Sequence, residues 1–386
     1  MAVLSVYLSP FAPDYSGVST VMFDLNTVTA MHDASGCTGN YTGYDEPRWY
    51  GSKSPIFCSG LREIDAILGD DEKLIRKMLQ AAEDLKPDLM SLVGSPVPMV
   101  IGSDMQGIAE ELQARSGIPS LGFDTTGTAY YDKGVAMATI ALLKKFTKKQ
   151  EMISGTVNIL GANPLDFGKG KNLEVLRNKI KEAGYGITAC LSMGYNMDAL
   201  QKASSAQVNL AVSRAGYLIA EYMYKTYGIP YLCGIPVGEK AGAGYFELLE
   251  EVIRTGENRI QRSTAEEKGE GEVLIIGEQV QSNALREALV TDFGETKVTV
   301  ACIFGKEAAL SSEGDLSLES EREITNEINS GKYRMIIADP FMEQLMEEGN
   351  KSVFLKNALY AVSSKVCGDE TPDMIGADFN TWYKAK

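Results

Sequence analysis

The sequence predicts an α/β protein made of three Rossmann-like domains, each with a parallel sheet flanked by helices. Short apolar runs alternate with helical stretches along the chain, which is the pattern of βαβ units. Two of these runs, Thr156–Gly161 and Glu272–Gly277, end in glycine at the point where a ligand-binding loop of a doubly wound sheet would begin. A chain of 386 residues is also long for one domain. We expect the domains at residues 1–150, 151–262 and 271–386.

The N-terminal domain is expected to begin with a partly irregular lead-in over residues 1–30. Within it, Val18–Leu25 could be either a helix or a strand. After residue 58 the alternation of predicted strands and helices becomes regular, because glycine and proline separate the apolar runs. Strands are predicted at Met90–Val93 and Ser120–Phe123, and helices over residues 61–83, Ile108–Ala114 and Gly134–Lys145.

The middle domain is predicted to contain four strands, and Ser213 is expected to be the N-cap of the helix after the third of them. Gly228 and Pro230 should end that helix. A polar and charged segment, Gln261–Gly271, is typical of a linker to the C-terminal domain. The strands of the middle domain are expected at Thr156–Gly161, Gly186–Leu191, Val208–Val212 and Tyr231–Cys233. Those of the C-terminal domain are expected at Glu272–Gly277, Lys297–Cys302 and Tyr333–Pro340, with a helix at Gln279–Thr291 and an exposed acidic loop at Ser311–Glu323.

Charge and composition exclude several classes of partner. The formal net charge of −15 would repel nucleic acid and anionic membranes, so neither is expected as a partner. No apolar run reaches the ~18 residues that a membrane span requires, and the N-terminus does not have the pattern of a signal peptide. The six cysteines are scattered, which fits a reducing compartment, and we expect a cytoplasmic protein.

Residues 31–58 are the strongest candidate for the chemistry. This segment holds the only histidine of the chain, His32, and two of its cysteines, Cys37 and Cys58. Gly36 and Gly39 flank Cys37 and would allow a bulky ligand to approach it closely. Soft thiolates select zinc, copper(I) or iron–sulfur clusters. The alternative is that these cysteines are small buried hydrophobic residues, since no Cys-x-x-Cys pair is present.

A second candidate site lies after the first strand of the middle domain. The loop between Gly161 and Gly170 contains Asn163 and Lys169 at the carboxyl end of a predicted strand, where doubly wound sheets bind ligands. The loop is not a P-loop, because six residues separate Gly161 from Gly168 and no Ser or Thr follows Lys169. We therefore expect that the chain does not bind ATP.

Four motifs in order along the chain resemble the nitrogenase component 1 family. His32-x-x-x-Gly36-Cys37 is similar to the His-Gly-x-x-Gly-Cys segment of that family, and Leu61–Leu74 is similar to its acidic segment. The other two motifs are Lys86–Met90 with Val100–Asp104, and Ala206–Leu210 with Tyr227–Tyr231. The resemblance covers roughly residues 30–236.

The resemblance implies three Rossmann-like domains and a reductive function. It implies that an iron-protein ATPase supplies electrons, which pass through an iron–sulfur cluster shared across a subunit interface to a substrate or cofactor precursor held between the domains. Cys37 would be a cluster ligand, Cys58 is a second candidate, and Asp33 or Asp45 could supply an oxygen ligand. Since one cluster needs about four protein ligands, the chain would share it with a second copy of itself or with a paired component 1-like subunit.

Several positions depart from the family pattern. Neither Phe11 nor Ala12 is a cysteine, where the first interface cysteine would fall, and the region of the third, Gly94–Pro98, contains proline. Ser213 stands at the cofactor-binding cysteine position of the middle domain, and no histidine follows His32. We therefore expect that the chain does not reduce dinitrogen on a molybdenum–iron cofactor of its own.

Two functions stay open at this point. The first is a subunit of a nitrogenase-like oxidoreductase. The second is a non-catalytic binding or scaffold protein that holds a tetrapyrrole, a metal cofactor or another small ligand in the interdomain cleft. The candidate residues that would line this cleft are Asn163, Lys169, Asn196 and Ser213. The alternative for these four is that they cap helices and fill loops.

Overall fold

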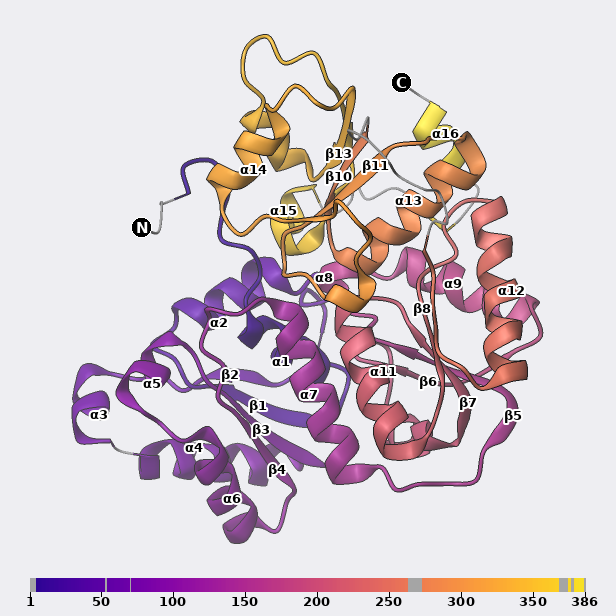
Figure 1. Ribbon diagram of the computed structural model, residues 1–386. Helices are drawn as coiled ribbons and strands as arrows, with labels where there is room; N and C mark the ends of the chain where they lie inside the picture. The colour runs from indigo at the N-terminus through magenta and orange to yellow at the C-terminus, as the bar shows by residue number, and fades with distance from the viewer. Residues whose placement is uncertain are drawn as a thin grey trace.

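Three parallel sheets with helices on their faces make up the chain (Figure 1), and this confirms the predicted α/β class with three Rossmann-like units. The computed structural model describes residues 5–52, 54–69, 71–262, 273–367, 374–375 and 378–384. Each unit contains one sheet and is named here by its place in the chain. The domain boundaries expected from the sequence stay a prediction.

The N-terminal unit has a four-stranded sheet in the order β2-β1-β3-β4. Its strands are β1 (Thr27–Met31), β2 (Ile56–Cys58), β3 (Leu89–Val93) and β4 (Ser120–Phe123). Its helices are α1 (Asp14–Met22), α2 (Gly36–Asn40), α3 (Glu63–Leu68), α4 (Asp71–Leu85), α5 (Pro96–Ile101), α6 (Met105–Ser116) and α7 (Tyr131–Phe146). A π-helical turn, η1 (Tyr41–Asp45), continues α2.

The middle unit has a five-stranded sheet in the order β6-β5-β7-β8-β9. Its strands are β5 (Ile153–Leu160), β6 (Gly186–Leu191), β7 (Ala206–Ala211), β8 (Tyr231–Cys233) and β9 (Arg259–Ile260). Its helices are α8 (Pro164–Phe167), α9 (Lys171–Glu182), α10 (Met197–Lys202), the 3₁₀ turn η2 (Ala203–Ser205), α11 (Arg214–Tyr227) and α12 (Lys240–Thr255).

The C-terminal unit has a five-stranded sheet in the order β12-β11-β10-β13-β14. Its strands are β10 (Val273–Gly277), β11 (Val298–Cys302), β12 (Leu316–Ser317), β13 (Met335–Ala338) and β14 (Val353–Lys356). Its helices are α13 (Gln279–Phe293), α14 (Glu321–Ile328), α15 (Tyr360–Cys367) and α16 (Asp378–Lys384), with 3₁₀ turns η3 (Ala308–Leu310) and η4 (Pro340–Leu345).

The lead-in is more regular than the sequence suggested. Within the stretch that could be helix or strand, Val18–Met22 are helical and form the C-terminal part of α1. After a short turn, Thr27–Met31 form β1, a central strand of the sheet. β1 is hard to recognise because Thr27 and Thr29 interrupt its apolar run, although both are buried. Of the predicted linker, residues 263–271 lie outside the described residues.

Two glycines let α1 and α7 cross with their backbones in contact. A Cβ atom at Gly17 would lie 2.0 Å from the Tyr131 carbonyl oxygen, and one at Gly134 would lie 1.9 Å from that of Asp14. Only glycine allows this approach. α1 also contacts β1 and β3 of the N-terminal sheet, while α7 packs against α11 of the middle unit. Within the described ranges, no helix has the length and apolar content needed to cross a bilayer.

Candidate functional site

Cys37 and Cys58 lie at the carboxyl edge of the N-terminal sheet. Cys58 is the last residue of β2 and is paired in register with Met31, the last residue of β1. Cys37 follows the end of β1 by a short loop and lies in the first turn of α2. This edge is where open parallel sheets bind ligands.

Both thiols contact Asp33. The Cys58 thiol donates to the Asp33 carbonyl oxygen at 3.3 Å and accepts from the Gly60 amide at 3.3 Å. The Asp33 carboxylate accepts from the Thr38 amide at 3.1 Å, which holds the first turn of α2 against the loop. The electrostatic environment of Cys37 also includes this carboxylate. The fold thus places two cysteines that are distant in sequence on either side of one residue.

The Cys37 thiol is half-buried among hydroxyl groups. Burial is the largest cause that raises the pKa of this thiol, and the negative charge of Asp33 adds to it. The neighbouring hydroxyls of Tyr15 and Ser95 favour the thiolate and oppose this shift. Without a metal ion the thiol is therefore neutral near pH 7, and binding of a metal would have to release its proton.

His32 is held in place by hydrogen bonds to two serine hydroxyls. Its Nδ1 atom lies 2.9 Å from the Ser59 hydroxyl, and its carbonyl oxygen accepts from the Ser95 hydroxyl at 2.8 Å. Burial is the largest cause that lowers the pKa of the imidazole. The ring is thus neutral and links the loop after β1 to the strand end of β2.

One chain supplies only part of a metal site. Among the residues that the structure describes, no group of three or more His, Cys, Asp or Glu side chains could hold a metal ion. Phe11, which stands where the first interface cysteine of the family would fall, packs on the rings of Tyr130 and Phe304. Asp45, named as a further oxygen ligand, accepts from Ser16 at 2.6 Å and Asn40 at 2.8 Å with the same oxygen. Cys37 and Cys58 could thus supply at most two of the about four protein ligands of an iron–sulfur cluster.

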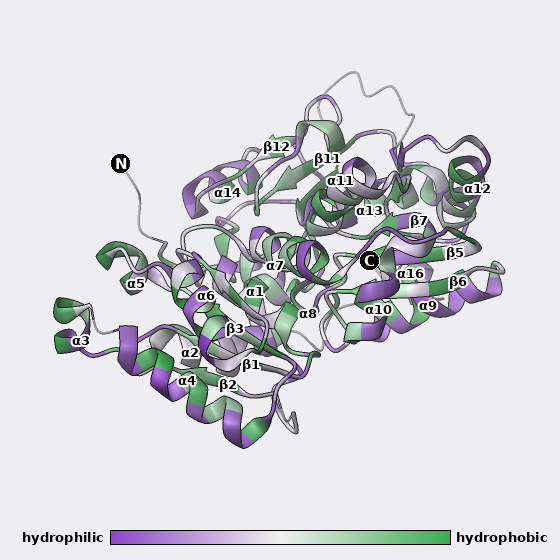
Figure 2. Cartoon of the chain, turned by 90° about the horizontal axis from the view of Figure 1, so that it is seen from below, coloured by the Kyte–Doolittle hydropathy of each residue, from purple (hydrophilic) through white to green (hydrophobic). Residues whose placement is uncertain are grey.

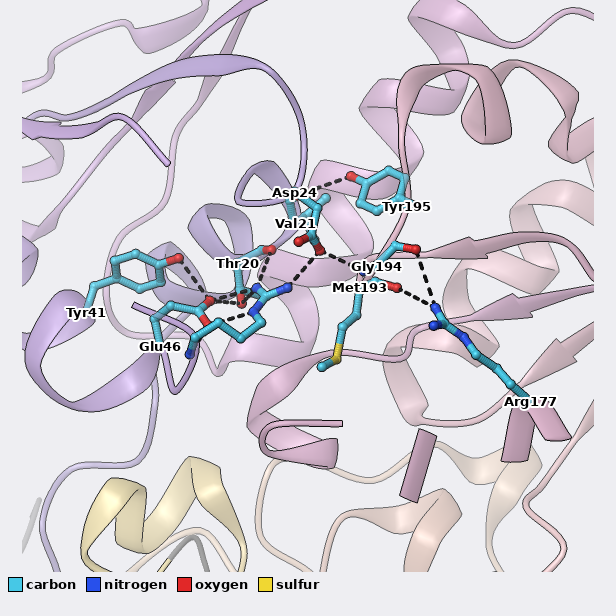
Figure 3. A network of polar contacts seen from close by, with 10 residues as sticks. Thr20, Val21, Asp24, Tyr41, Glu46, Arg177, Met193, Gly194 and Tyr195 are labelled. Atoms are coloured by element: carbon cyan, nitrogen blue, oxygen red, sulfur yellow. Dashed lines mark hydrogen bonds and ion pairs between the residues drawn. The ribbon is translucent and has the colours of Figure 1, made fainter. Parts of the chain in front are cut away.

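An ion-pair network holds the segment that carries Cys37 (Figure 3). Arg48 binds Glu46 through Nε and Nη2, both at 2.7 Å, and binds Asp24 on the chain after α1 at 2.7 Å. The second oxygen of Glu46 also accepts from the Thr20 hydroxyl at 2.7 Å. The Asp24 carboxylate in turn accepts from the Gly194 amide at 2.7 Å in the middle unit. This network joins α1, the segment after η1 and the loop after β6.

An exposed apolar patch adjoins the two cysteines. It is formed by α3 and α5, the short helices that follow the carboxyl ends of β2 and β3, and Figure 2 shows both helices at one end of the N-terminal unit. A small cavity lined by His32, Leu61, Gly69 and Ile101 separates them. The exposed apolar side chains of the patch are Ile64, Ile67, Leu68, Val97, Met99, Val100 and Ile101. Clusters of this kind mark interaction surfaces.

The four residues predicted to line the interdomain cleft lie at the carboxyl edge of the middle sheet. Three of them cap helices: Asn163 accepts from the amides of Leu165 and Asp166, Asn196 caps α10, and Ser213 caps α11 as expected. Asn163 and Ser213 meet, because both donate to the Gly161 carbonyl oxygen, at 3.0 Å and 2.8 Å. Lys169 and Asn196 are exposed. A role of these four in ligand binding stays a prediction.

Three contributors to the site are absent from the sequence-based expectations: Tyr15, Ser95 and Arg48. Ser95 follows β3, which was predicted, so the rule that ligands bind at carboxyl strand ends could have indicated it. Tyr15 has no comparable signal, because Cys37 lies in another element. Arg48 lies in the same segment as Glu46, but nothing local indicates its second partner, Asp24.

Comparisons with known proteins agree with this architecture. The family model described as nitrogenase component 1 type oxidoreductase matches residues 14–330. The nitrogenase iron-molybdenum cofactor biosynthesis protein NifE of Clostridium pasteurianum is 28% identical over 46% of this chain and 38% of its own length. One subunit of the light-independent protochlorophyllide reductase of Heliobacterium modesticaldum is 21% identical over 83% of this chain and 59% of its own length.

A solved structure shares the whole fold. The structure titled "Nitrogenase Cp1 at pH 5" superposes with a TM-score of 0.68 at 16% identity and covers 100% of this chain and 92% of its own. The alignments with the first curated relatives span well under two thirds of those proteins, 38% and 39% of their length. Because the family model matches more than half of the sequence, the chain belongs to the nitrogenase component 1 type oxidoreductases.

Proposed function

We propose that the chain is a subunit of a nitrogenase-like oxidoreductase that receives electrons from an iron-protein ATPase and reduces a substrate or cofactor precursor. The observation that carries this proposal is the meeting of Cys37 and Cys58 around Asp33 at the carboxyl edge of the sheet. Both thiols are only half-buried, whereas Cys190, Cys233, Cys302 and Cys367 are buried. The two half-buried thiols are therefore the ones available to a shared group.

An iron–sulfur cluster is the group that this donor set would hold. Cys37 and Cys58 would each supply a thiolate, and the other ligands would come from a second copy of the chain or a paired component 1-like subunit. When bound, the cluster would carry single electrons. The chain's own residues would orient and tune it: the hydroxyls of Tyr15 and Ser95 lie beside the Cys37 sulfur and favour its thiolate form.

The apolar patch is proposed as the docking surface for the ATPase. It lies beside the loops that carry the two cysteines, so a partner bound there would be close to the cluster. A Rossmann-like unit with a soluble partner is consistent with our proposal of a cytoplasmic protein. The absence of a P-loop pattern in the sequence supports a separate nucleotide-binding protein.

The test of the cluster is the iron content of anaerobically purified protein. Cys37→Ala should lose most of its iron and its visible absorption, because one of about four ligands is removed. Cys190→Ala is the matched control, since this thiol is buried in the middle unit and should leave the iron unchanged. Iron content that is equal in both variants would refute the proposal.

The test of the docking surface is binding of a nitrogenase iron-protein-like ATPase. Ile67→Asp places a charge on the patch and should weaken binding, because apolar contact is lost. Ile153→Asp is the control, since it alters another exposed isoleucine, on the middle sheet. If both variants bind the ATPase as the wild type does, the patch is not the docking surface.

A scaffold function is the second candidate. The observation that favours it is the likeness to a protein named for cofactor biosynthesis. Such a protein would hold a tetrapyrrole, a metal cofactor or another small ligand without reducing it. Protein that is colourless and free of iron and sulfide after anaerobic purification would support the scaffold and contradict the reductase.

A further inference from the structure

The three units meet at a buried junction centred on Arg214. This residue begins α11 in the middle unit, and its side chain is 6% exposed. Its guanidinium forms an ion pair with Asp132 on α7, donates to the Phe304 carbonyl oxygen at 2.9 Å, and binds Glu307 at 2.9 Å. One side chain of the middle unit thus binds both other units.

Each unit contributes a buried carboxyl group to this junction. Asp132 belongs to the N-terminal unit, Asp166 to the middle unit and Glu278 to the C-terminal unit. Glu278 caps α13 and accepts from the backbone amides of Arg214, at 2.6 Å, and Gln281, at 2.8 Å. Asp166 accepts from the Tyr131 hydroxyl and, at 2.5 Å, from the Asn163 side chain. Arg214 attracts Asp132 and Glu278, while Asp166 faces the negative charges of Glu278 and Asp132.

Burial favours the protonated form of these carboxyls. It is the largest cause that raises the pKa of Glu278 to about 7 and the pKa of Asp132 to about 6, and it also raises the pKa of Asp166. The attraction of Arg214 opposes the shift of Asp132 without cancelling it.

The positive charge of Lys133 on α7 favours the ionised form of Asp132. Further groups around the junction add negative charge or stay neutral. The Tyr131 hydroxyl on α7 faces Asp166, and Glu307 faces Arg214 with one more negative charge. The thiols of Cys233 on β8 and Cys302 on β11 face Glu278, and burial raises the pKa of both, so they stay neutral.

Aromatic rings pack beside Arg214. The Phe304 ring packs against the rings of Phe11, Tyr130 and Tyr131 at 5.6, 5.7 and 5.1 Å between centroids. The cavity beside Asp166, between the middle and C-terminal units, is about 40 Å³, which is room for water and not for a cofactor.

The packing of the junction is also imperfect. Two of its buried atoms, Arg214 Nε and Asp132 Oδ1, have no hydrogen-bond partner among the described residues. A buried polar atom without a partner destabilises the packed state.

We propose that this junction is a proton-dependent clasp: it closes the three units on one another, fills the place between them with the chain's own side chains, and opens when its carboxyls ionise. Ionisation would place three carboxylates, one from each unit, close to one another, with Arg214 as counter-ion to only two of them. Their mutual repulsion would act across all three units. This inference does not depend on the cluster at Cys37.

The test is hydrogen–deuterium exchange of the full wild-type chain at pH 6.0 and pH 8.5, expressed as protection factors so that intrinsic exchange rates cancel. Peptides that contain Asp132, Asp166 or Phe304–Glu307 should lose protection on the order of tenfold at the higher pH, because the closed state binds more protons. Peptides of α4, which is remote from the junction, should not change. Protection that is independent of pH at the junction would overturn the proposal.

Variants sharpen the test. Glu278→Gln removes one ionisable group and should reduce the pH dependence of protection, even though loss of the helix cap lowers protection at both pH values. Glu257→Gln is the control, since this carboxylate is 65% exposed and should leave the wild-type pH dependence intact. Asp132→Asn replaces Glu278→Gln if the latter does not fold. Full wild-type pH dependence in the junction variant would also overturn the proposal.

Discussion

Replacing Arg48 with methionine should destabilise the chain strongly, because it leaves a buried carboxylate without its counter-ion. The side chain of Arg48 is 15% exposed and that of Glu46 is 0% exposed. In the variant, Glu46 would keep only the hydroxyls of Thr20 and Tyr41 and the backbone amide of residue 48 as donors. Breaking one partner of a buried ion pair costs about 3–5 kcal/mol. The assay is urea unfolding followed by circular dichroism.

The matched control is Arg115→Met. Arg115 also binds two carboxylates, Glu72 and Glu111, but its side chain is 38% exposed and theirs are 57% and 48% exposed, so solvent screens the pairs. The urea midpoint of this variant should stay close to that of the wild type. Arg48→Lys should recover only part of the loss, since an ammonium cannot form the bidentate pair. If Arg48→Met costs less than about 1 kcal/mol, the typical value for an exposed pair, the reasoning from burial is wrong.

Three further predictions follow from the site and its surroundings. Burial raises the pKa of Asp45 to about 7, so the folded state binds the extra proton. The contribution of Asp45 to the free energy of unfolding should therefore fall as pH rises from about 4 to 7. Asp45→Asn should remove that slope in urea unfolding at a series of pH values, and an unchanged slope would contradict this expectation. The isolated chain should bind no Mg-ATP in calorimetry, and tight magnesium-dependent binding would refute the need for a separate ATPase. Cys302→Ala should cost only on the order of 1 kcal/mol, as a buried packing residue, and leave the iron content unchanged; loss of iron would show that this thiol is a ligand.

Much of the fold can be predicted from the sequence because strands buried on both faces appear as continuous apolar runs. Leu89–Val93 and Val273–Gly277 are of this kind, and both form central or near-central strands. The strands that escaped prediction depart from this rule. β1 contains two threonines, while β12 is a two-residue edge strand and β14 has exposed ends. Such segments form strands because they pair with neighbouring strands, and not because of their own composition.

The sequence by itself determined the α/β class, the three-unit organisation and the choice of Cys37, because each rests on local patterns: periodicity, punctuation by glycine, and a short motif. Only the tertiary structure decided which side chains gather around that cysteine and what fills the space between the units. Tyr15 and Ser95 reach Cys37 from other elements, and Arg214 meets Asp132 although the two are 82 residues apart. Asparagine and serine can cap a helix or bind a ligand with the same atoms. Arginine can likewise bind a ligand or form a buried ion pair with one guanidinium. The surfaces that folding brings against them select among these roles, because a polar group that is removed from water takes whatever partner lies within hydrogen-bonding distance.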